Sequence, residues 1–260
     1  MPCGRCDQCR AGRTHTCRAL RYLGCPGQAE GCLSERIVMP EACCFPVPEG
    51  MSAEEAALSE PLSIGLYAVK LSVPMRADTR VAVLGAGPIG LSVLLSARAL
   101  GAGRVVVTEP IPERRAFAEE QGADRGFDPH RPDAVETLLA EAPEGFDTVF
   151  ECCGEQEALD QAVRLLKPGG KLMLVGIPEG ERVTFSIDLL RRQELCLQNV
   201  RRQVDCVQPA LDLIAAGRVP VAALVTHRYP LEATREAFEK VEAYADGVVK
   251  AMISFPDHFT

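Results

Sequence analysis

Four cysteines within the first seventeen residues constrain the fold of this chain more than any other feature: Cys3, Cys6, Cys9 and Cys17. Thiolates at such short spacing on a turn-rich backbone can converge on one ion, and four of them complete a tetrahedral zinc shell with no position left for water. We therefore expect a structural zinc. An iron–sulfur cluster is less favoured, because a ferredoxin-type run ends on a nearer cysteine followed by proline, whereas Arg18 follows the last cysteine here.

Length and charge fit a globular protein of about one and a half domains. The 260 residues are 47% hydrophobic and 25% charged, which is ordinary for a folded protein. A net charge of -8 argues against nucleic acid or an anionic membrane as a partner, because each would call for a basic surface. Twelve cysteines, four of them at metal spacing, and the absence of a signal peptide at Met1 predict a reducing, cytoplasmic location.

From residue 80 onwards, continuous apolar runs alternate with helical patterns. Runs of this kind suit strands buried on both faces, and the alternation predicts a parallel sheet with right-handed crossovers. The expected strands are 81–84, 104–108, 146–150, 171–175 and 195–200, with helices at 89–100, 112–121, 133–141, 155–166 and 207–216. The fold class is therefore α/β, with a doubly wound Rossmann parallel sheet.

The flanking segments have a different character. Residues 1–50 predict a loop lobe followed by short strands, of which 35–39 is the clearest. Ser52 and Glu55 form the pattern of a capping box and begin a helix. Near the end of the chain, residues 222–260 predict a strand, a helix at 231–243 and a last strand at 248–253.

A glycine-rich loop follows the first predicted strand and opens the first helix, with Gly85, Gly87, Pro88, Ile89 and Gly90. The first glycine allows a tight turn, the second lets the backbone approach a pyrophosphate, and the third lets the helix pack closely on the strand. Proline suits the first helical turn, and the free amides with the helix dipole attract phosphate. The loop predicts dinucleotide binding, with a ligand-free glycine turn as the alternative.

Glu109 stands at the end of the second predicted strand, about twenty residues past the loop. A carboxylate there accepts hydrogen bonds from both ribose hydroxyls and repels a 2′-phosphate, so NAD is favoured over NADP. Arg114 and Arg115 would favour NADP if they reached the ribose. We expect them on the exposed face of the next helix instead.

Three further runs complete a resemblance that covers the whole chain: Ser59–Gly65, Phe150–Gly154 and Val225–Glu232 with Ala237-Phe238. With the cysteine lobe and the glycine loop, the chain resembles the zinc-dependent medium-chain dehydrogenase family, in its sorbitol (L-iditol) dehydrogenase-like branch. The resemblance implies a zinc- and NAD-dependent oxidoreductase that transfers hydride from a secondary alcohol of a polyol to NAD, giving a ketose. It also implies a homodimer or homotetramer.

The same resemblance assigns roles to individual residues. Glu60 would lie at the catalytic zinc as a ligand or close neighbour. Cys152, Val175 and Gly176 would line the nicotinamide, and Arg201 would face the substrate or the cofactor. His15 in the lobe is expected at the surface, and His227 is expected to be structural.

The resemblance also divides the chain. Residues 1–55 would be part of a mostly β, GroES-like catalytic domain with the zinc lobe, 56–216 the NAD-binding Rossmann domain, and 217–260 a segment returning to the catalytic domain. The family holds its catalytic zinc through a cysteine and a His-Glu pair ahead of the lobe, and neither is in this sequence. We therefore expect the N-terminal part of the catalytic domain to be lacking and the chain as written to be weakly active or inactive. The alternative is a non-catalytic NAD-binding or assembly protein with one structural zinc.

Overall fold

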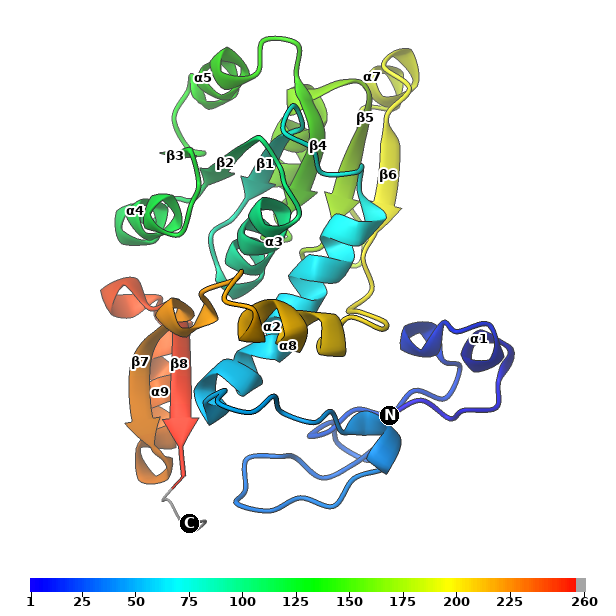
Figure 1. The fold of residues 1–260 in the computed structure, drawn as a ribbon. Helices are drawn as coiled ribbons and strands as arrows, with labels where there is room; N and C mark the ends of the chain where they lie inside the picture. Colours follow the sequence, from blue (N-terminus) through cyan, green and yellow to red (C-terminus); the bar gives the residue numbers. More distant parts are fainter. Residues whose placement is uncertain (256–260) are drawn as a thin grey trace.

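The computed structural model describes residues 1–255, built around a six-stranded parallel sheet (Figure 1). Its strands run β3-β2-β1-β4-β5-β6 across the sheet. They are β1 (Arg80–Leu84), β2 (Arg104–Thr108), β3 (Arg125–Phe127), β4 (Phe146–Glu151), β5 (Leu166–Leu174) and β6 (Cys196–Asn199). This is the order of a Rossmann sheet, in which the strand order reverses between β1 and β4. The predicted fold class is confirmed, and β3 is a strand that the sequence pattern did not predict.

Helices cover both faces of this sheet. Successive residues of β1 alternate between two apolar clusters: Val81 and Val83 pack with α2, α3 and α8, whereas Ala82 and Leu84 pack with α5 and α6. The alternation follows from the two-residue period of a strand, so both faces of β1 are buried. The helices are α2 (Ala53–Leu71), α3 (Pro88–Ala99), α4 (Pro112–Glu120), α5 (Ala134–Glu141), α6 (Gln156–Leu165), α7 (Ile187–Arg192) and α8 (Val207–Ala215).

Helix α2 links the lobe to the Rossmann part. Ser52 and Glu55 form the predicted capping box, so the helix begins where the sequence indicates. Gly65 then allows α2 to pack closely on α3, because a Cβ at this position would lie 2.4 Å from the carbonyl carbon of Ser92. Leu58, Leu62 and other apolar side chains of α2 are fully buried in this contact.

The N-terminal lobe consists of loops with α1 (Asp7–Arg10), η1 (Thr14–Thr16) and η2 (Glu41–Cys43). The prediction of a strand at 35–39 is wrong, because residues 1–52 contain no strand. A strand needs a neighbour to pair its backbone groups and cover its apolar side chains. In this segment Val38 is 100% exposed and Ile37 is 42% exposed, so its apolar side chains are not covered as those of a core strand would be.

The C-terminal segment forms a second, two-stranded sheet. Strands β7 (Val225–Pro230) and β8 (Lys250–Ser254) pair in parallel, and α9 (Thr234–Glu242) connects them with η4 (Leu231–Ala233) and η5 (Ala245–Gly247). A short turn, η3 (Val221–Leu224), precedes β7. Arg228 of β7 forms an ion pair with Glu54 at the start of α2, with an Nη2–Oε2 distance of 2.7 Å. The end of the predicted segment, residues 256–260, lies outside the described residues. Within residues 1–255, no helix is long and apolar enough to span a bilayer.

Candidate dinucleotide site and metal centre

The glycine loop lies at the carboxyl end of β1, between the carboxyl ends of β2 and β4. Leu84, the last residue of β1, is in register with Thr108 of β2 and Glu151 of β4. In doubly wound sheets this reversal of strand order opens a crevice at the carboxyl ends, where ligands bind. The fold thus brings the loop, Glu109 and the end of β4 to one edge of the sheet.

Each glycine of the loop has its own structural reason. Gly85 has φ of 99°, a conformation that favours glycine. A Cβ on Gly90 would lie 1.8 Å from the carbonyl oxygen of Gly85, so only glycine lets α3 start this close to the turn. A Cβ on Gly87 would meet no atom within 4 Å. The protein itself leaves Gly87 room for a side chain, which fits a position where a ligand approaches the backbone.

The N-terminus of α3 offers free backbone donors to that space. Gly87 is its N-cap and Pro88 stands in its first turn, and no side chain caps the helix. The first amides of a helix have no partner within it, and its dipole is positive at this end. Ile89 and Gly90 lie in this turn. These residues therefore offer backbone donors that suit a pyrophosphate, and the binding itself stays a prediction.

Glu109 is tied directly to the glycine loop. It is 4% exposed, and its Oε2 accepts a hydrogen bond from the Ala86 amide at 2.9 Å while Oε1 accepts one from the Ile111 amide at 3.1 Å. A carboxylate has about four acceptor positions, so two remain after these bonds. Its geometry is compatible with the two ribose hydroxyls, and this role stays a prediction.

The expectation that Arg114 and Arg115 both lie on an exposed face is wrong for Arg114. Its side chain is buried at 6% exposure, its guanidinium donates to the carbonyl oxygen of Val248, and it lies 5.0 Å from the centre of the Tyr244 ring. The reason is tertiary, because the C-terminal segment covers this part of α4. Arg115 is half-buried and donates to the carbonyl oxygen of Glu109.

The ends of β4 and β5 bring together the three residues expected at the nicotinamide. The amide of Cys152 donates to the carbonyl of Leu84 at 2.9 Å, and the amides of Val175 and Gly176 both donate to the backbone carbonyl of Glu151 at 2.9 Å. The pKa of the Cys152 thiol is raised, mainly by burial and secondly by the nearby Glu151 carboxylate. These three residues form one backbone-linked group beside the glycine loop, while their contact with a cofactor stays a prediction.

Sequence reasoning missed Glu151. Its side chain is 2% exposed, and its Oε1 accepts hydrogen bonds from the amides of Cys153 at 2.7 Å and Gly154 at 2.5 Å. Poor hydration of its sulfur is the larger cause, and the charge of Glu151 the second, of a pKa of about 12 for the Cys153 thiol. The available signal was a carboxylate at the end of an apolar strand, directly ahead of a glycine turn.

Among residues 1–255, neither predicted catalytic residue has a side-chain hydrogen bond to this group. The exposed Arg201 donates a hydrogen bond to the Tyr22 hydroxyl of the lobe, and Arg202 stacks 4.3 Å from the centre of the same ring. Glu60 lies exposed on α2, and no group of three or more potential metal ligands within residues 1–255 includes it. Their catalytic roles stay predictions.

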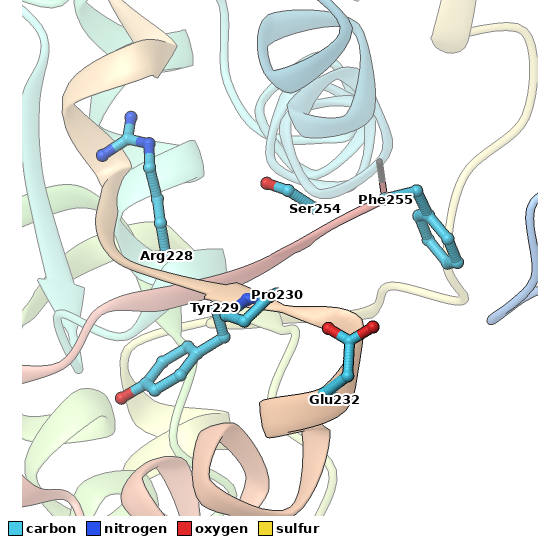
Figure 2. Close-up of a pocket in the computed structure, with 6 residues that line it drawn as sticks. All are labelled: Arg228, Tyr229, Pro230, Glu232, Ser254 and Phe255. Carbon is cyan, nitrogen blue, oxygen red and sulfur yellow. The ribbon is translucent and has the colours of Figure 1, made fainter. Parts of the chain in front are cut away.

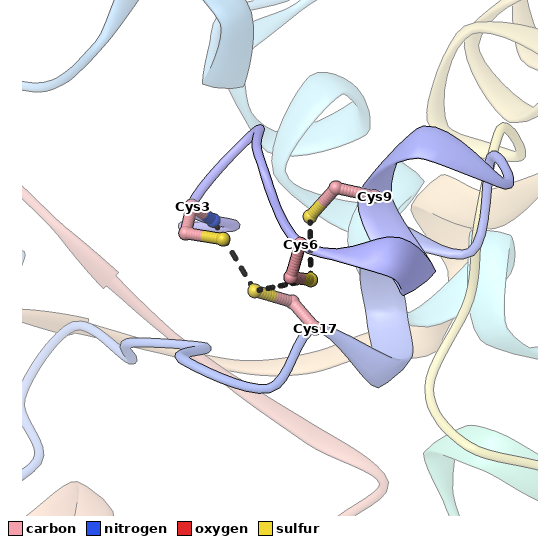
Figure 3. A group of neighbouring side chains, drawn as sticks. All are labelled: Cys3, Cys6, Cys9 and Cys17. Atoms are coloured by element: carbon pink, nitrogen blue, oxygen red, sulfur yellow. Dashed lines mark hydrogen bonds between the residues drawn. The ribbon is translucent and has the colours of Figure 1, made fainter.

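The four cysteines of the lobe do converge (Figure 3). All four Sγ atoms lie within 4.8 Å of one another, with 3.6 Å between Cys6 and Cys9 and 3.9 Å between Cys6 and Cys17. Tetrahedral zinc with Zn–S bonds of about 2.3 Å separates its sulfurs by about 3.8 Å. The donor set and its spacing therefore fit a structural zinc ion.

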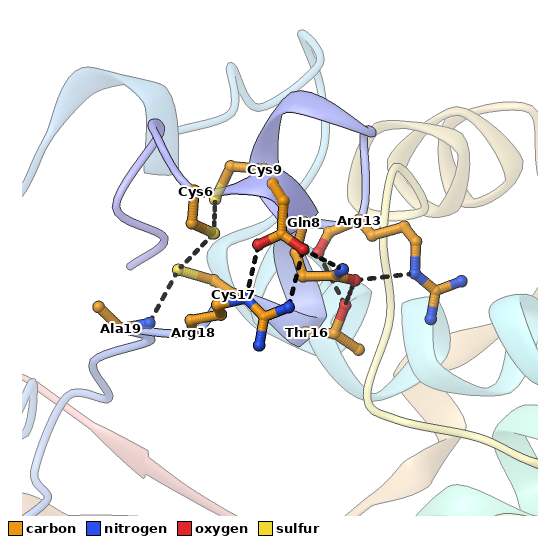
Figure 4. A network of polar contacts seen from close by, with 9 residues as sticks. Cys6, Gln8, Cys9, Arg13, Thr16, Cys17, Arg18 and Ala19 are labelled. Atoms are coloured by element: carbon orange, nitrogen blue, oxygen red, sulfur yellow. Dashed lines mark hydrogen bonds and ion pairs between the residues drawn. The ribbon is translucent and has the colours of Figure 1, made fainter.

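Hydrogen bonds around the quartet hold it in place (Figure 3 and Figure 4). Cys17 Sγ accepts from the amides of Cys3 at 3.2 Å and Ala19 at 3.4 Å. The backbone amide of Arg18 lowers the pKa of the Cys6 thiol to about 6, whereas burial and the neighbouring thiols raise that of Cys9 to about 12. Four thiols this close cannot all ionise alone, and a divalent cation would supply the missing charge.

His15 anchors the lobe to α2, contrary to the expectation that it lies at the surface. It is 8% exposed, its Nε2 is hydrogen-bonded to the Tyr67 hydroxyl at 3.2 Å, and the two rings meet edge to face. Burial lowers the pKa of this imidazole, so it is neutral at neutral pH. The helix α2 covers it, which no local pattern around His15 could indicate.

A separate surface pocket of about 400 Å³ lies at the ends of β7 and β8 (Figure 2). It is lined by Arg228, Tyr229, Pro230, Glu232, Ser254 and Phe255. The pocket belongs to the two-stranded sheet, not to the carboxyl edge of the six-stranded one. It does not coincide with the predicted dinucleotide site.

Known proteins share this arrangement. Residues 88–216 match the family described as zinc-binding dehydrogenase. The chain is 31% identical over 254 residues to sorbitol dehydrogenase of Bacillus subtilis, covering 97% of this chain and 71% of that protein. It is also 31% identical over 265 residues to L-idonate 5-dehydrogenase of Vitis vinifera, covering 98% and 70% of the two chains.

Solved structures agree. A protein of Sinorhizobium meliloti 1021 that was assigned as a zinc-binding dehydrogenase, bound to NADP, matches with a TM-score of 0.90 at 32% identity, over 98% of this chain and 74% of that one. An oxidoreductase/dehydrogenase of unknown specificity from Escherichia coli matches with a TM-score of 0.93 at 28% identity, over 99% and 74% of the chains. The chain therefore belongs to the zinc-binding dehydrogenase family, in its medium-chain, sorbitol dehydrogenase-like branch.

Proposed function

We propose that this protein binds NAD at the carboxyl edge of its six-stranded sheet and oxidises a secondary alcohol of a polyol to a ketone. The observation that carries the proposal is the Glu109 carboxylate bonded to the Ala86 amide of the glycine loop. The relatives named for sorbitol and L-idonate support the substrate class. NAD would accept the hydride, and a catalytic zinc would act as Lewis acid on the alcohol oxygen.

Each group of residues has a part in this function. The first turn of α3 binds the pyrophosphate, and Glu109 holds the adenosine ribose and disfavours a 2′-phosphate. Cys152, Val175 and Gly176 line the nicotinamide. Glu60 would contribute a ligand or a neighbouring carboxylate to a catalytic zinc, and Arg201 would face the substrate or the cofactor. Cys3, Cys6, Cys9 and Cys17 hold the structural zinc.

The proposal extends to organisation and location. Residues 1–55 belong to a catalytic domain, 56–216 form the NAD-binding domain, and 217–260 return to the catalytic domain. Helix α2 crosses the first of these boundaries as one continuous element. The protein works in the cytoplasm as a homodimer or homotetramer. The net charge of -8 supports small-molecule partners over nucleic acid or membrane.

The test is a comparison of binding and turnover. Calorimetry with NAD and NADP measures cofactor preference, and NADH formation with sorbitol, xylitol, butanediol and threonine measures the reaction. We expect an active form of the protein to bind NAD selectively and to oxidise sorbitol or xylitol. Preference for NADP, or turnover of threonine alone, would contradict the proposal.

A second function is favoured by one observation. Within residues 1–255, the cysteine quartet is the one group of three or more metal ligands, and Glu60 is not joined by others. That fits a non-catalytic NAD-binding or assembly protein with one structural zinc. NAD binding with one zinc per chain and no turnover of any polyol would support this function over the first.

A further inference from the structure

Glu151 is a buried carboxylate without a cationic partner. Its side chain is 2% exposed, and no ion pair involves it among residues 1–255. Burying a charge is costly unless hydrogen bonds compensate. Here the compensation comes from two backbone donors, the amides of Cys153 and Gly154, which both point to Oε1. The carboxylate therefore closes the turn that follows β4.

The second oxygen of Glu151 lies against the end of β5. A Cβ built on Gly176 would lie 2.7 Å from Oε2 and 2.3 Å from the amide nitrogen of Gly154. A Cβ on Gly154, which has φ of 81°, would lie 2.5 Å from the carbonyl oxygen of Ile177. Neither glycine has room for a side chain. The carboxylate, the turn at 152–154 and the end of β5 thus interlock.

The interlocked residues occupy one end of the proposed cofactor site. Cys152 begins the turn, and Gly176 is the residue against which Oε2 lies. Both belong to the group proposed to line the nicotinamide. The pyrophosphate and ribose contacts come instead from the loop after β1 and from Glu109. A change at Glu151 should therefore affect one end of a bound dinucleotide and spare the other.

We propose that Glu151 is a positioning residue that fixes the backbone around the nicotinamide ring. The inference rests on the proposed function, because it assumes that Cys152 and Gly176 line that ring. Its basis is hydrogen bonding, so a neutral side chain with an acceptor oxygen in the same place should serve. A side chain of similar size without an acceptor should not.

The experiment compares two ligands on each variant. NADH carries the nicotinamide, and ADP-ribose is the same molecule without it, so the ratio of their affinities isolates the nicotinamide end. We expect Glu151→Leu to weaken NADH binding about tenfold or more, since it leaves two buried amides without an acceptor. The same variant should bind ADP-ribose within about twofold of the unaltered protein. Glu151→Gln should restore NADH affinity to within about threefold.

Two further variants complete the test. In Gly176→Ala the added methyl, two residues after β5, crowds the same Oε2 and the amide of Gly154, so it should reproduce the selective loss of NADH even if Glu151→Leu fails to fold. Glu155→Leu removes an exposed carboxylate four residues away and should change neither affinity. Unchanged NADH binding in Glu151→Leu and Gly176→Ala, or equal loss of both ligands, would overturn the inference. If the unaltered protein binds neither ligand, the proposed function itself fails.

Discussion

The carboxylate of Glu109 accepts a hydrogen bond from the backbone amide of Ala86, with 2.9 Å between Oε2 and the nitrogen. The two residues lie at the ends of neighbouring parallel strands, where the register sets Leu84 opposite Thr108. The bond joins the acid that we propose selects the ribose to the loop that we propose binds the pyrophosphate. In this proposal, the residues for cofactor choice and for phosphate binding are linked by one hydrogen bond.

Cofactor preference should follow the charge of Glu109. We expect Glu109→Ser combined with Pro110→Arg to lower NAD affinity and raise NADP affinity, because the 2′-phosphate then meets a cation in place of a carboxylate. A change in preference of about tenfold to a hundredfold corresponds to one or two well-formed hydrogen bonds. Calorimetry with both dinucleotides measures it. An unaltered protein that already prefers NADP would refute the assignment of Glu109.

Zinc content should depend on the quartet alone. We expect metal analysis to find about one tightly held zinc per chain, and Cys9→Ser to release it, because three thiolates leave the tetrahedral shell open. Losing the ion should destabilise the lobe while NAD binding persists, because the glycine loop belongs to the six-stranded sheet and not to the lobe. Cys25→Ser is the control that keeps its zinc. Iron in the purified protein, or two zincs per chain, would contradict this prediction.

The attachment of the lobe to α2 should depend on Tyr67. Tyr67→Phe removes the hydroxyl bonded to His15 Nε2, and His15 Nδ1 already has no partner among the described residues. A buried imidazole left without hydrogen bonds should cost about 1–3 kcal/mol of unfolding free energy. Denaturant titration measures the loss. Tyr229→Phe, in β7, serves as the matched control, and an equal effect there would argue against a specific attachment.

The C-terminal sheet should loosen when Arg114 is replaced. Arg114→Met keeps the stem of the side chain but removes the guanidinium that donates to Val248, so we expect a loss of about 1–3 kcal/mol. Limited proteolysis near residues 243–248 should become faster. Arg131→Met removes an exposed arginine paired with Asp133 and should change stability by less than about 1 kcal/mol. Equal sensitivity of the two variants would show that Arg114 anchors nothing.

Much of the fold was predictable because its signals are local. A continuous run of apolar residues predicts a buried strand, and a capping box predicts where α2 begins. The glycines between β1 and α3 predict a turn that side chains would block. Cys3, Cys6, Cys9 and Cys17 lie within one short loop, so their spacing alone brings the sulfurs together. Strand β3 and helix α7 escaped prediction because both are short.

The sequence by itself determined the Rossmann sheet, the glycine loop and the cysteine quartet, since each depends on residues close together along the chain. Only the tertiary structure decided that His15 and Arg114 are buried and that residues 35–39 form no strand. Those outcomes depend on what packs against each residue, and the covering segments are α2 and the C-terminal residues, far away in sequence. Glu151 shows the same limit: its two bonds are local, but the close contact with Gly176 exists only because β4 and β5 are neighbours in the sheet.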